Sequence, residues 1–212
     1  PIKEMSKISS KIINQNGKKA LQYSSTEGIY DLRKSIADRM KRFNVNSSSE
    51  NILITSGSQQ GLEFTGKLFI DEGDVIICED PSYIGALNAF RCYNPKFVGV
   101  PMDNQGMLMD TLEETLEEYP KAKFIYTIPN YQNPTGVSMS NERKKKLVEL
   151  SLKYNIPVIE ENPYIELKFE EKENFPIKSY DKKNQVIYLG SFSKTFCPGL
   201  RIGWILASED II

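Results

Sequence analysis

The sequence VIYLGSFSK, residues 186–194, begins with four consecutive apolar residues and then passes into a polar turn that contains a lysine. Six further short apolar runs follow residue 51, at 52–55, 75–78, 97–100, 124–128, 158–159 and 202–206. An unbroken apolar run of this length is typical of a strand that is buried on both faces, as in a mostly parallel sheet. The runs therefore predict one sheet of seven strands.

Amphipathic segments lie between these runs. Apolar residues fall on one helical face at Leu32, Ile36, Met40 and Phe43, and again at Leu147, Leu150 and Tyr154. The lysines at 144, 145 and 146 precede the second set, and we interpret them as a solvated helix face rather than a nucleic-acid patch. Strands that alternate with helices predict an α/β fold of three layers, α/β/α. We assign residues 29–212 to this domain and residues 1–28 to a polar N-terminal arm.

The composition is that of an ordinary globular protein. The 212 residues are 40% apolar, 26% charged and 10% aromatic, which excludes the collagen-like, coiled-coil and disordered classes. The formal net charge is -1, so nothing in it favours nucleic acid or an anionic membrane as a partner. No apolar run approaches the length of a membrane span and no signal peptide is visible, so we expect a cytoplasmic protein.

Cysteine and histidine usage limits the chemistry. Cys78, Cys92 and Cys197 stand far apart without a CxxC pair, which favours free thiols in a reducing compartment over a disulfide framework. The chain has no histidine, which excludes histidine-based catalytic triads, and we predict no metal site. Acid–base chemistry must therefore come from Lys, Tyr, Asp, Glu or Cys.

The polar turn after residue 189 carries the most informative motif. Ser191 and Ser193 stand two residues apart, so in an extended chain they point the same way, and Lys194 and Arg201 follow them. Serine hydroxyls with an arginine suit a phosphate group, and the neighbouring amine suits a Schiff base. The turn follows a strand, where α/β sheets hold their ligands. A polar loop with an incidental lysine explains the spacing equally well.

A second motif, TSGSQQG at residues 55–61, lies between a strand and a helix. Small residues at such a turn allow the backbone N–H groups of a helix N-terminus to approach a phosphate. A simple turn with Ser58 as the helix N-cap is the interpretation that the motif alone favours.

Two more polar motifs follow buried strands. NYQNPTG, residues 130–136, has the proline and glycine of a turn, but a turn does not require its amide side chains, such as that of Asn133. EENPY, residues 160–164, ends a buried strand with two acids, Glu160 and Glu161, which is costly unless a cation or a hydrogen-bond donor meets them or both reach solvent.

All four motifs therefore stand at the carboxyl ends of strands in one predicted sheet. Together they bring phosphate donors, an amine, an acid and an amide to one edge, with Tyr83 or Tyr164 available for contact with a ring. This combination suits a phosphorylated pyridine aldehyde, and the convergence of the four is far more specific than any one motif.

The chain resembles a fold-type-I, pyridoxal-phosphate-dependent aminotransferase of class I/II. The motifs that carry the resemblance are NPTG, SFSK and GLRIGW in the family's order, preceded by LQYSSTEG at residues 21–28. Within the class it is similar to the branch of 2-aminoadipate and kynurenine aminotransferases and of the aminotransferase-like domains of MocR regulators. The resemblance implies a transaminase with pyridoxal 5′-phosphate as its cofactor and with an amino acid and a 2-oxo acid as its substrates.

The resemblance also implies a role for each matching residue. Lys194 would form a Schiff base with the cofactor and shuttle a proton. The cofactor phosphate would be held by Ser58, Gln59, Ser191, Ser193 and Arg201. Tyr23 would reach the phosphate of a neighbouring subunit, which implies a homodimer.

The ring of the cofactor would have its own contacts. Tyr83 would lie over one face and Pro163 over the other, while Asn133 and Tyr164 would hydrogen-bond the 3′-oxygen. Glu161 would pair with the pyridine nitrogen, although the family usually has the shorter Asp at this position. Together with Lys194, both Tyr83 and Glu161 are expected to be catalytic.

The resemblance covers the cofactor-binding large domain. The family's small domain, with the arginine that grips the substrate carboxylate, would follow residue 212, so we expect the present chain to be inactive alone. Three alternatives remain open: a β-lyase on the same fold, the effector domain of a MocR-type regulator, and a truncated product without activity.

Overall fold

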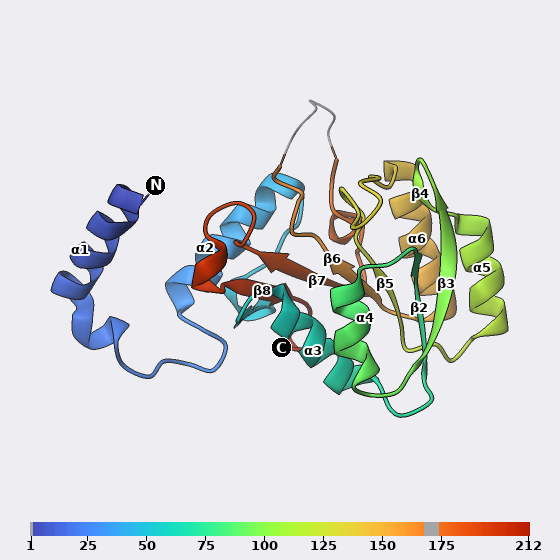
Figure 1. The fold of residues 1–212 in the computed structure, drawn as a ribbon, viewed down its shortest axis with the longest axis horizontal. Coiled ribbons are helices and arrows are strands. Elements are labelled where there is room, and N and C mark those ends of the chain that lie inside the picture. Colours follow the sequence, from blue (N-terminus) through green and yellow to red (C-terminus); the bar gives the residue numbers. More distant parts are fainter. Residues whose placement is uncertain (1, 168–173) are drawn as a thin grey trace.

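In the computed structural model, which describes residues 2–167 and 174–212, one mixed sheet runs through the middle of the molecule (Figure 1). Its eight strands have the order β1-β8-β7-β6-β5-β2-β3-β4. Their bounds are β1 Ile52–Thr55, β2 Val75–Asp80, β3 Lys96–Asp103, β4 Gly106–Met107, β5 Phe124–Thr127, β6 Val158–Glu161, β7 Val186–Ser191 and β8 Gly203–Leu206.

The central strands are parallel. β3, β2, β5, β6 and β7 pair in parallel, whereas β8 runs antiparallel to both β7 and β1. The carboxyl ends of β1, β2, β5, β6 and β7 therefore share one edge of the sheet, and β8 begins at that edge. Every polar motif singled out in the sequence follows one of these strand ends, so the topology brings the motifs together.

The sequence predicted seven strands, whereas the sheet in the described residues has eight. All seven apolar runs form strands, and the eighth is β4, which pairs antiparallel with the end of β3 across a short turn. Gly106 begins this strand with φ +99°, a backbone conformation that favours glycine. Two residues are too few to produce a recognisable apolar pattern, which is why the sequence did not reveal β4.

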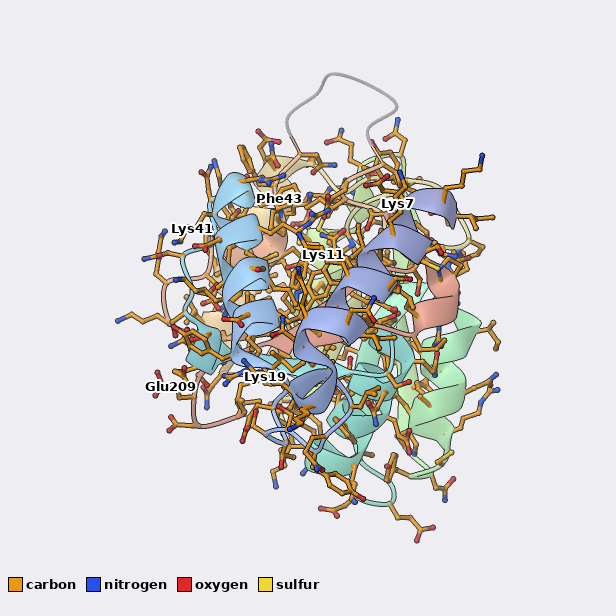
Figure 2. All side chains as sticks on the ribbon, turned by 90° about the vertical axis from the view of Figure 1, so that its left-hand side faces the viewer. Lys7, Lys11, Lys19, Lys41, Phe43 and Glu209 are labelled. Atoms are coloured by element: carbon orange, nitrogen blue, oxygen red, sulfur yellow. The ribbon has the colours of Figure 1, made fainter. Side chains whose placement is uncertain are left out.

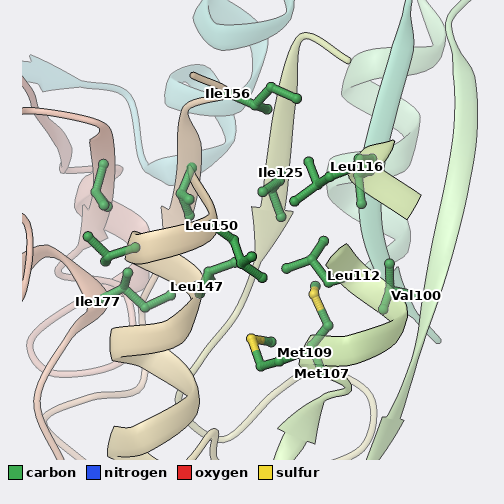
Figure 3. Packing of buried hydrophobic residues seen from close by; sticks show 14 of the residues in the cluster. Val100, Met107, Met109, Leu112, Leu116, Ile125, Leu147, Leu150, Ile156 and Ile177 are labelled. Carbon is green, nitrogen blue, oxygen red and sulfur yellow. The ribbon is translucent and has the colours of Figure 1, made fainter. Parts of the chain in front are cut away.

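Helices cover both faces of the sheet, which makes the three layers of the predicted α/β fold. The longer helices are α1 Ile2–Ala20, α2 Tyr30–Met40, α3 Ser58–Phe69, α4 Ile84–Arg91, α5 Met109–Glu118 and α6 Asn141–Tyr154, and short 3-10 turns are η1 Lys41–Phe43, η2 Ser49–Asn51, η3 Ile177–Ser179 and η4 Pro198–Leu200. One face packs against α3 and α4, around Leu62 and Phe90. The opposite face packs against α5 and α6, around Leu112 and Leu147 (Figure 3), and against α2 nearer to β8.

The predicted polar arm contains a helix. None of the residues of α1 is buried, and Figure 1 shows this helix apart from the sheet. Lys7, Lys11 and Lys19 mark its course in Figure 2. The chain rejoins the body at Glu27, whose carbonyl accepts a hydrogen bond from the Ile54 N–H. Residue 1 lies outside the described residues, and the division at residue 28 stays a prediction.

The interpretation of lysines 144, 145 and 146 as a solvated helix face was wrong for Lys144. Lys145 is exposed, but Lys144 is fully buried, with its Nζ 2.5 Å from Asn130 Oδ1 and 2.7 Å from the Phe175 carbonyl. The cause is helical geometry, because Lys144 lies three and four residues before the buried Leu147 and Val148 and shares their face.

None of the helices within the described ranges is both long enough and apolar enough to cross a membrane.

Candidate active site

A pocket of about 280 Å³ opens at the shared carboxyl edge of the strands. It is lined by Ser58, Gln59, Tyr83, Ile128, Asn133, Glu161, Pro163, Tyr164, Ser191, Ser193, Lys194, Pro198 and Arg201. Eleven of the twelve residues predicted to bind the cofactor are in this set. The structure therefore brings together side chains that are spread over more than 140 positions of the sequence.

The exception is Tyr23. It lies in the segment between α1 and α2, is 99% exposed and does not line the pocket. A role for Tyr23 toward a neighbouring subunit stays a prediction.

One corner of the pocket is formed where the start of α3 meets β8. Gly57 is the N-cap of α3, with φ +76°, so the expectation of Ser58 as the N-cap was wrong. A Cβ atom on Gly203 would stand 2.5 Å from the Gly57 carbonyl carbon and 2.7 Å from the Ser58 nitrogen. Because neither distance leaves room for a side chain, glycine at 203 is what allows the start of α3, with the pocket-lining Ser58 and Gln59, to lie close against β8.

Arg201 closes the same corner. Its backbone is left-handed, with φ +52°, at the end of the 3-10 turn η4, and a Cβ atom on Gly57 would stand 2.7 Å from its Nη2. The guanidinium therefore lies against the N-terminus of α3. The positive guanidinium and the positive end of the helix dipole repel each other, and an anion bound between them would be attracted to both. The arrangement therefore favours an anionic ligand at this corner.

The loop after β7 adds hydroxyls and the lysine. Ser191 ends the strand almost completely buried, and its Oγ accepts a hydrogen bond from the Ser193 N–H at 3.1 Å. The next residue, Lys194, is exposed and holds its Nζ 6.0 Å from the ring centroid of Tyr164. Lys194 is thus an exposed lysine in the lining of the pocket, whereas Ser191 in the same lining is buried.

Glu161 supplies a buried carboxylate to the lining of the pocket. Only 3% of the residue is exposed, and its Oε2 accepts a hydrogen bond from the Tyr126 hydroxyl at 2.7 Å. The pKa of Glu161 is raised, because the effect of burial is larger than that of the hydrogen bonds from Tyr126 and Ser58, which lower the pKa. A buried carboxylate with two donors is suited to meet a cationic ligand group.

Glu160 faces the opposite side of the sheet, as alternation along a strand requires. Its oxygens accept hydrogen bonds from the N–H groups of Ile177 and Lys178, at 3.0 and 2.8 Å, and from Asn162 Nδ2 at 2.8 Å. The positive charge of Lys144 also acts on it, although burial still raises its pKa. Both Glu160 and Glu161 are buried, so the alternative that the two acids of this motif reach solvent is wrong.

Aromatic and amide groups complete the pocket. Tyr83 precedes α4, and a side chain at Gly85 would collide with its ring, so the glycine leaves room for that ring. Burial, and then the negative charge of Glu161, raise the pKa of the Tyr83 hydroxyl, which keeps it protonated. Asn133 is half-buried on the loop after β5.

Three residues that do not line the pocket support the site and were not predicted from the sequence: Glu79, Gln132 and Tyr126. Glu79 accepts hydrogen bonds from Thr127 Oγ1 at 2.5 Å, from the Ile128 N–H at 3.1 Å and from Gln132 Nε2 at 3.2 Å, and burial raises its pKa to about 7. Gln132 also donates to the Pro81 carbonyl, so it joins the loops that carry Tyr83 and Asn133. A signal for Glu79 was present, because it is an acid at the end of a buried strand, like Glu160.

The donor set fits a phosphorylated pyridine aldehyde. The pocket is lined by serine hydroxyls, by the Arg201 guanidinium and by residues at the start of α3, which are groups that suit a phosphate. Its lining also includes a buried carboxylate, Glu161, for a protonated ring nitrogen and an amine, Lys194, that can react with an aldehyde. The fit rests on the chemistry of these groups, and Gly57 and Gly203 contribute by allowing Arg201, β8 and the start of α3 to approach one another closely.

Comparisons with known proteins agree with this chemistry. The family described as "Aminotransferase class I and II" matches residues 2–212. The aromatic-amino-acid aminotransferase 1 of Thermococcus litoralis is 43% identical over all of this chain and 52% of its own length. The crystal structure of Pyrococcus horikoshii kynurenine aminotransferase is 40% identical with a TM-score of 0.93, over 98% of this chain and 52% of that one.

A regulator is also similar. The HTH-type transcriptional regulator YdfD of Bacillus subtilis, itself uncharacterized, is 38% identical over 91% of this chain and 40% of its own length. The chain spans about half the length, or less, of the curated relatives that it matches. Similarity over this region therefore does not separate transaminases from regulators.

Proposed function

Because the chain belongs to the class I and II aminotransferases, we propose that the whole protein transfers an amino group between an amino acid and a 2-oxo acid with pyridoxal 5′-phosphate as its cofactor. The observation that carries the proposal is the convergence of Lys194, Glu161 and Arg201 on one pocket. An amine, a buried carboxylate and an anion-binding corner are together what the cofactor needs, whereas each occurs alone in many unrelated proteins.

Bound pyridoxal phosphate would supply an aldehyde that accepts the amino group and a ring that withdraws electrons from the substrate. Lys194 would hold the aldehyde carbon covalently through Nζ and, once released, carry a proton between substrate and cofactor carbons. The phosphate would be bound by Arg201, by the hydroxyls of Ser191 and Ser193 and by Ser58 and Gln59 at the start of α3.

The remaining residues would orient the ring. Glu161 would hold a proton on the pyridine nitrogen, which the electron-withdrawing chemistry requires. Tyr83 and Pro163 would confine the two faces of the ring, and Asn133 and Tyr164 would hydrogen-bond its 3′-oxygen. All five residues line the pocket, which supports these assignments without testing them.

We also propose that the protein acts as a homodimer. Tyr23 is 99% exposed in the segment between α1 and α2 and does not line the pocket of its own chain, so it is available to a neighbouring subunit. A hydroxyl supplied in this way would complete the phosphate site from outside.

The experiment that tests the proposal uses the full-length protein that contains this chain. The protein is incubated with pyridoxal phosphate and reduced with borohydride, and its peptides are mapped. We expect the label on Lys194, and we expect Lys194→Ala to lose it while Lys145→Ala, a change at an exposed lysine of α6, keeps it. A label on another lysine, or none, would contradict the assignment.

A regulator that binds the cofactor without turnover is the second candidate, and the similarity to YdfD favours it. The same labelled site is expected for both functions, so labelling alone does not separate them. Incubating the loaded protein with a panel of amino acids and 2-oxo acids does. Appearance of the new amino acid supports the transaminase, whereas stable loading without any product favours the regulator.

A further inference from the structure

The Tyr126 hydroxyl donates a hydrogen bond to the carboxylate of Glu161. Tyr126 lies on β5, is completely buried, and its hydroxyl stands 2.7 Å from Glu161 Oε2. In the register of the two strands, Tyr126 is opposite Ile159 and Thr127 is opposite Glu160. Tyr126 and Glu161 are therefore diagonal neighbours on the same face of the sheet, where their side chains can meet.

The ring that carries this hydroxyl has little freedom to move. It packs edge-on against Phe90 of α4, with ring centroids 5.7 Å apart and planes inclined by 79°, and Phe90 in turn packs edge-on against Phe124. Burial, together with the charge of Glu161, raises the pKa of the Tyr126 hydroxyl well above its ordinary value, so it remains a donor. The donor thus has a fixed position and a fixed protonation state.

A fixed donor matters because glutamate is longer than aspartate by one methylene. The extra rotatable bond gives the carboxylate more positions, and holding it in one of them costs entropy. A rigid buried donor selects one of those positions and stabilises the charged carboxylate. Ser58, at the start of α3, is a second donor to Glu161, and the charge of Glu161 also acts on the Tyr83 hydroxyl. Tyr164 and Lys194 are titratable groups that line the same pocket.

We propose that Tyr126 is a positioning residue that holds the Glu161 carboxylate in place for the pyridine nitrogen of the cofactor. The inference rests on the proposed function, because it needs a ring nitrogen for Glu161 to meet. It assigns to a residue outside the pocket the task of compensating for the longer acid at position 161. Tyr126 itself does not line the pocket and would act only through Glu161.

The test compares two ligands on the full-length apoprotein. One is pyridoxal phosphate and the other is the analogue in which a carbon atom replaces the ring nitrogen. Both are titrated into the natural protein and into Tyr126→Phe, which removes one hydroxyl and keeps the ring. We expect Tyr126→Phe to reduce the preference for pyridoxal phosphate about tenfold or more, since hydrogen bonds to charged groups contribute about 1.5–3 kcal/mol. Affinity for the carbon analogue should be unchanged.

Two controls connect the effect to Glu161. Tyr188 is an equally buried tyrosine on β7 whose hydroxyl is 3.5 Å from the Asn162 carbonyl, so Tyr188→Phe should keep the full preference. Glu161→Gln should lose the preference, and adding Tyr126→Phe to it should change nothing further, because a residue that acts through Glu161 has no effect once that charge is absent.

The possible outcomes are distinguishable. Full preference in Tyr126→Phe together with its loss in Glu161→Gln would overturn the positioning role and leave the proposed function intact. Equal weakening of both ligands by Tyr126→Phe would also overturn it, since that is the signature of general damage to the pocket. Equal affinity of the natural protein for the two ligands would refute the pairing of Glu161 with the ring nitrogen, and the inference with it.

Discussion

Replacing Gly203 with alanine is expected to damage the corner of the pocket where we propose that the cofactor phosphate binds. The new Cβ would stand 2.5 Å from the Gly57 carbonyl carbon, 2.7 Å from the Ser58 nitrogen and 2.9 Å from the Gly190 carbonyl oxygen. All three neighbours are backbone atoms, so none can rotate away as a side chain would. The start of α3 and strand β8 must therefore separate.

The distances give the size of the effect. Non-bonded carbon atoms are comfortable at about 3.5–4.0 Å, so the start of α3 has to retreat by roughly 1 Å. Overpacking of this kind costs about 1–3 kcal/mol of folding free energy. A retreat of that size also breaks hydrogen bonds from this corner to a phosphate, each contributing about 1.5–3 kcal/mol, so the Kd for the cofactor should rise about 10- to 100-fold.

Titrating pyridoxal phosphate into the full-length apoprotein measures this change, and circular dichroism checks that the variant is folded. Gly199→Ala is the matched control, since it lies in the same motif and a Cβ there meets no atom within 4 Å. The reasoning fails if Gly203→Ala binds the cofactor as tightly as the natural protein does. It fails equally if Gly199→Ala weakens binding as much, because the close approach at 203 would then be irrelevant.

Three further outcomes are expected. Arg201→Ala should weaken cofactor binding about 10- to 100-fold, and Arg201→Lys should weaken it less, since lysine keeps the charge but not the planar guanidinium. Equal Kd values for the natural protein and both variants in a cofactor titration would place Arg201 away from the phosphate. Glu161→Gln at saturating cofactor should slow transamination on the order of 100-fold, and single-turnover kinetics at the parent rate would contradict this. Glu79→Gln should change the pH dependence of stability. The pKa of Glu79 is raised from 4.5 to about 7 on folding, so the folded state binds the proton of this carboxyl more tightly than the unfolded chain does. The resulting stabilisation of the folded protein is fully present below pH 4.5 and is lost as the pH rises through 7. The natural protein should therefore lose Tm relative to the variant between pH 5 and 8, and parallel Tm curves would refute this.

Local pattern was sufficient for most of the fold. All seven predicted strands form, because each unbroken apolar run is long enough to reveal its burial without knowledge of its neighbours. The eighth strand was missed because two residues carry no pattern. Lys144 was misjudged for a different reason. A lysine is normally exposed, and only the packing of α6 on the sheet places its Nζ among Asn130, Asn174 and the Phe175 carbonyl.

The sequence by itself determined which residues could serve the site, since the motifs carry their chemistry in residue type and spacing, and a parallel sheet gathers strand ends at one edge. Only the tertiary structure decided how those residues are held. It brought the N–H group of Lys178 to Glu160 and the Tyr126 hydroxyl to Glu161, and it made Gly57 rather than Ser58 the N-cap of α3. The physical reason is that hydrogen bonds and close approaches join residues from different strands, and their distances depend on register and packing that the order of residues along one chain does not express.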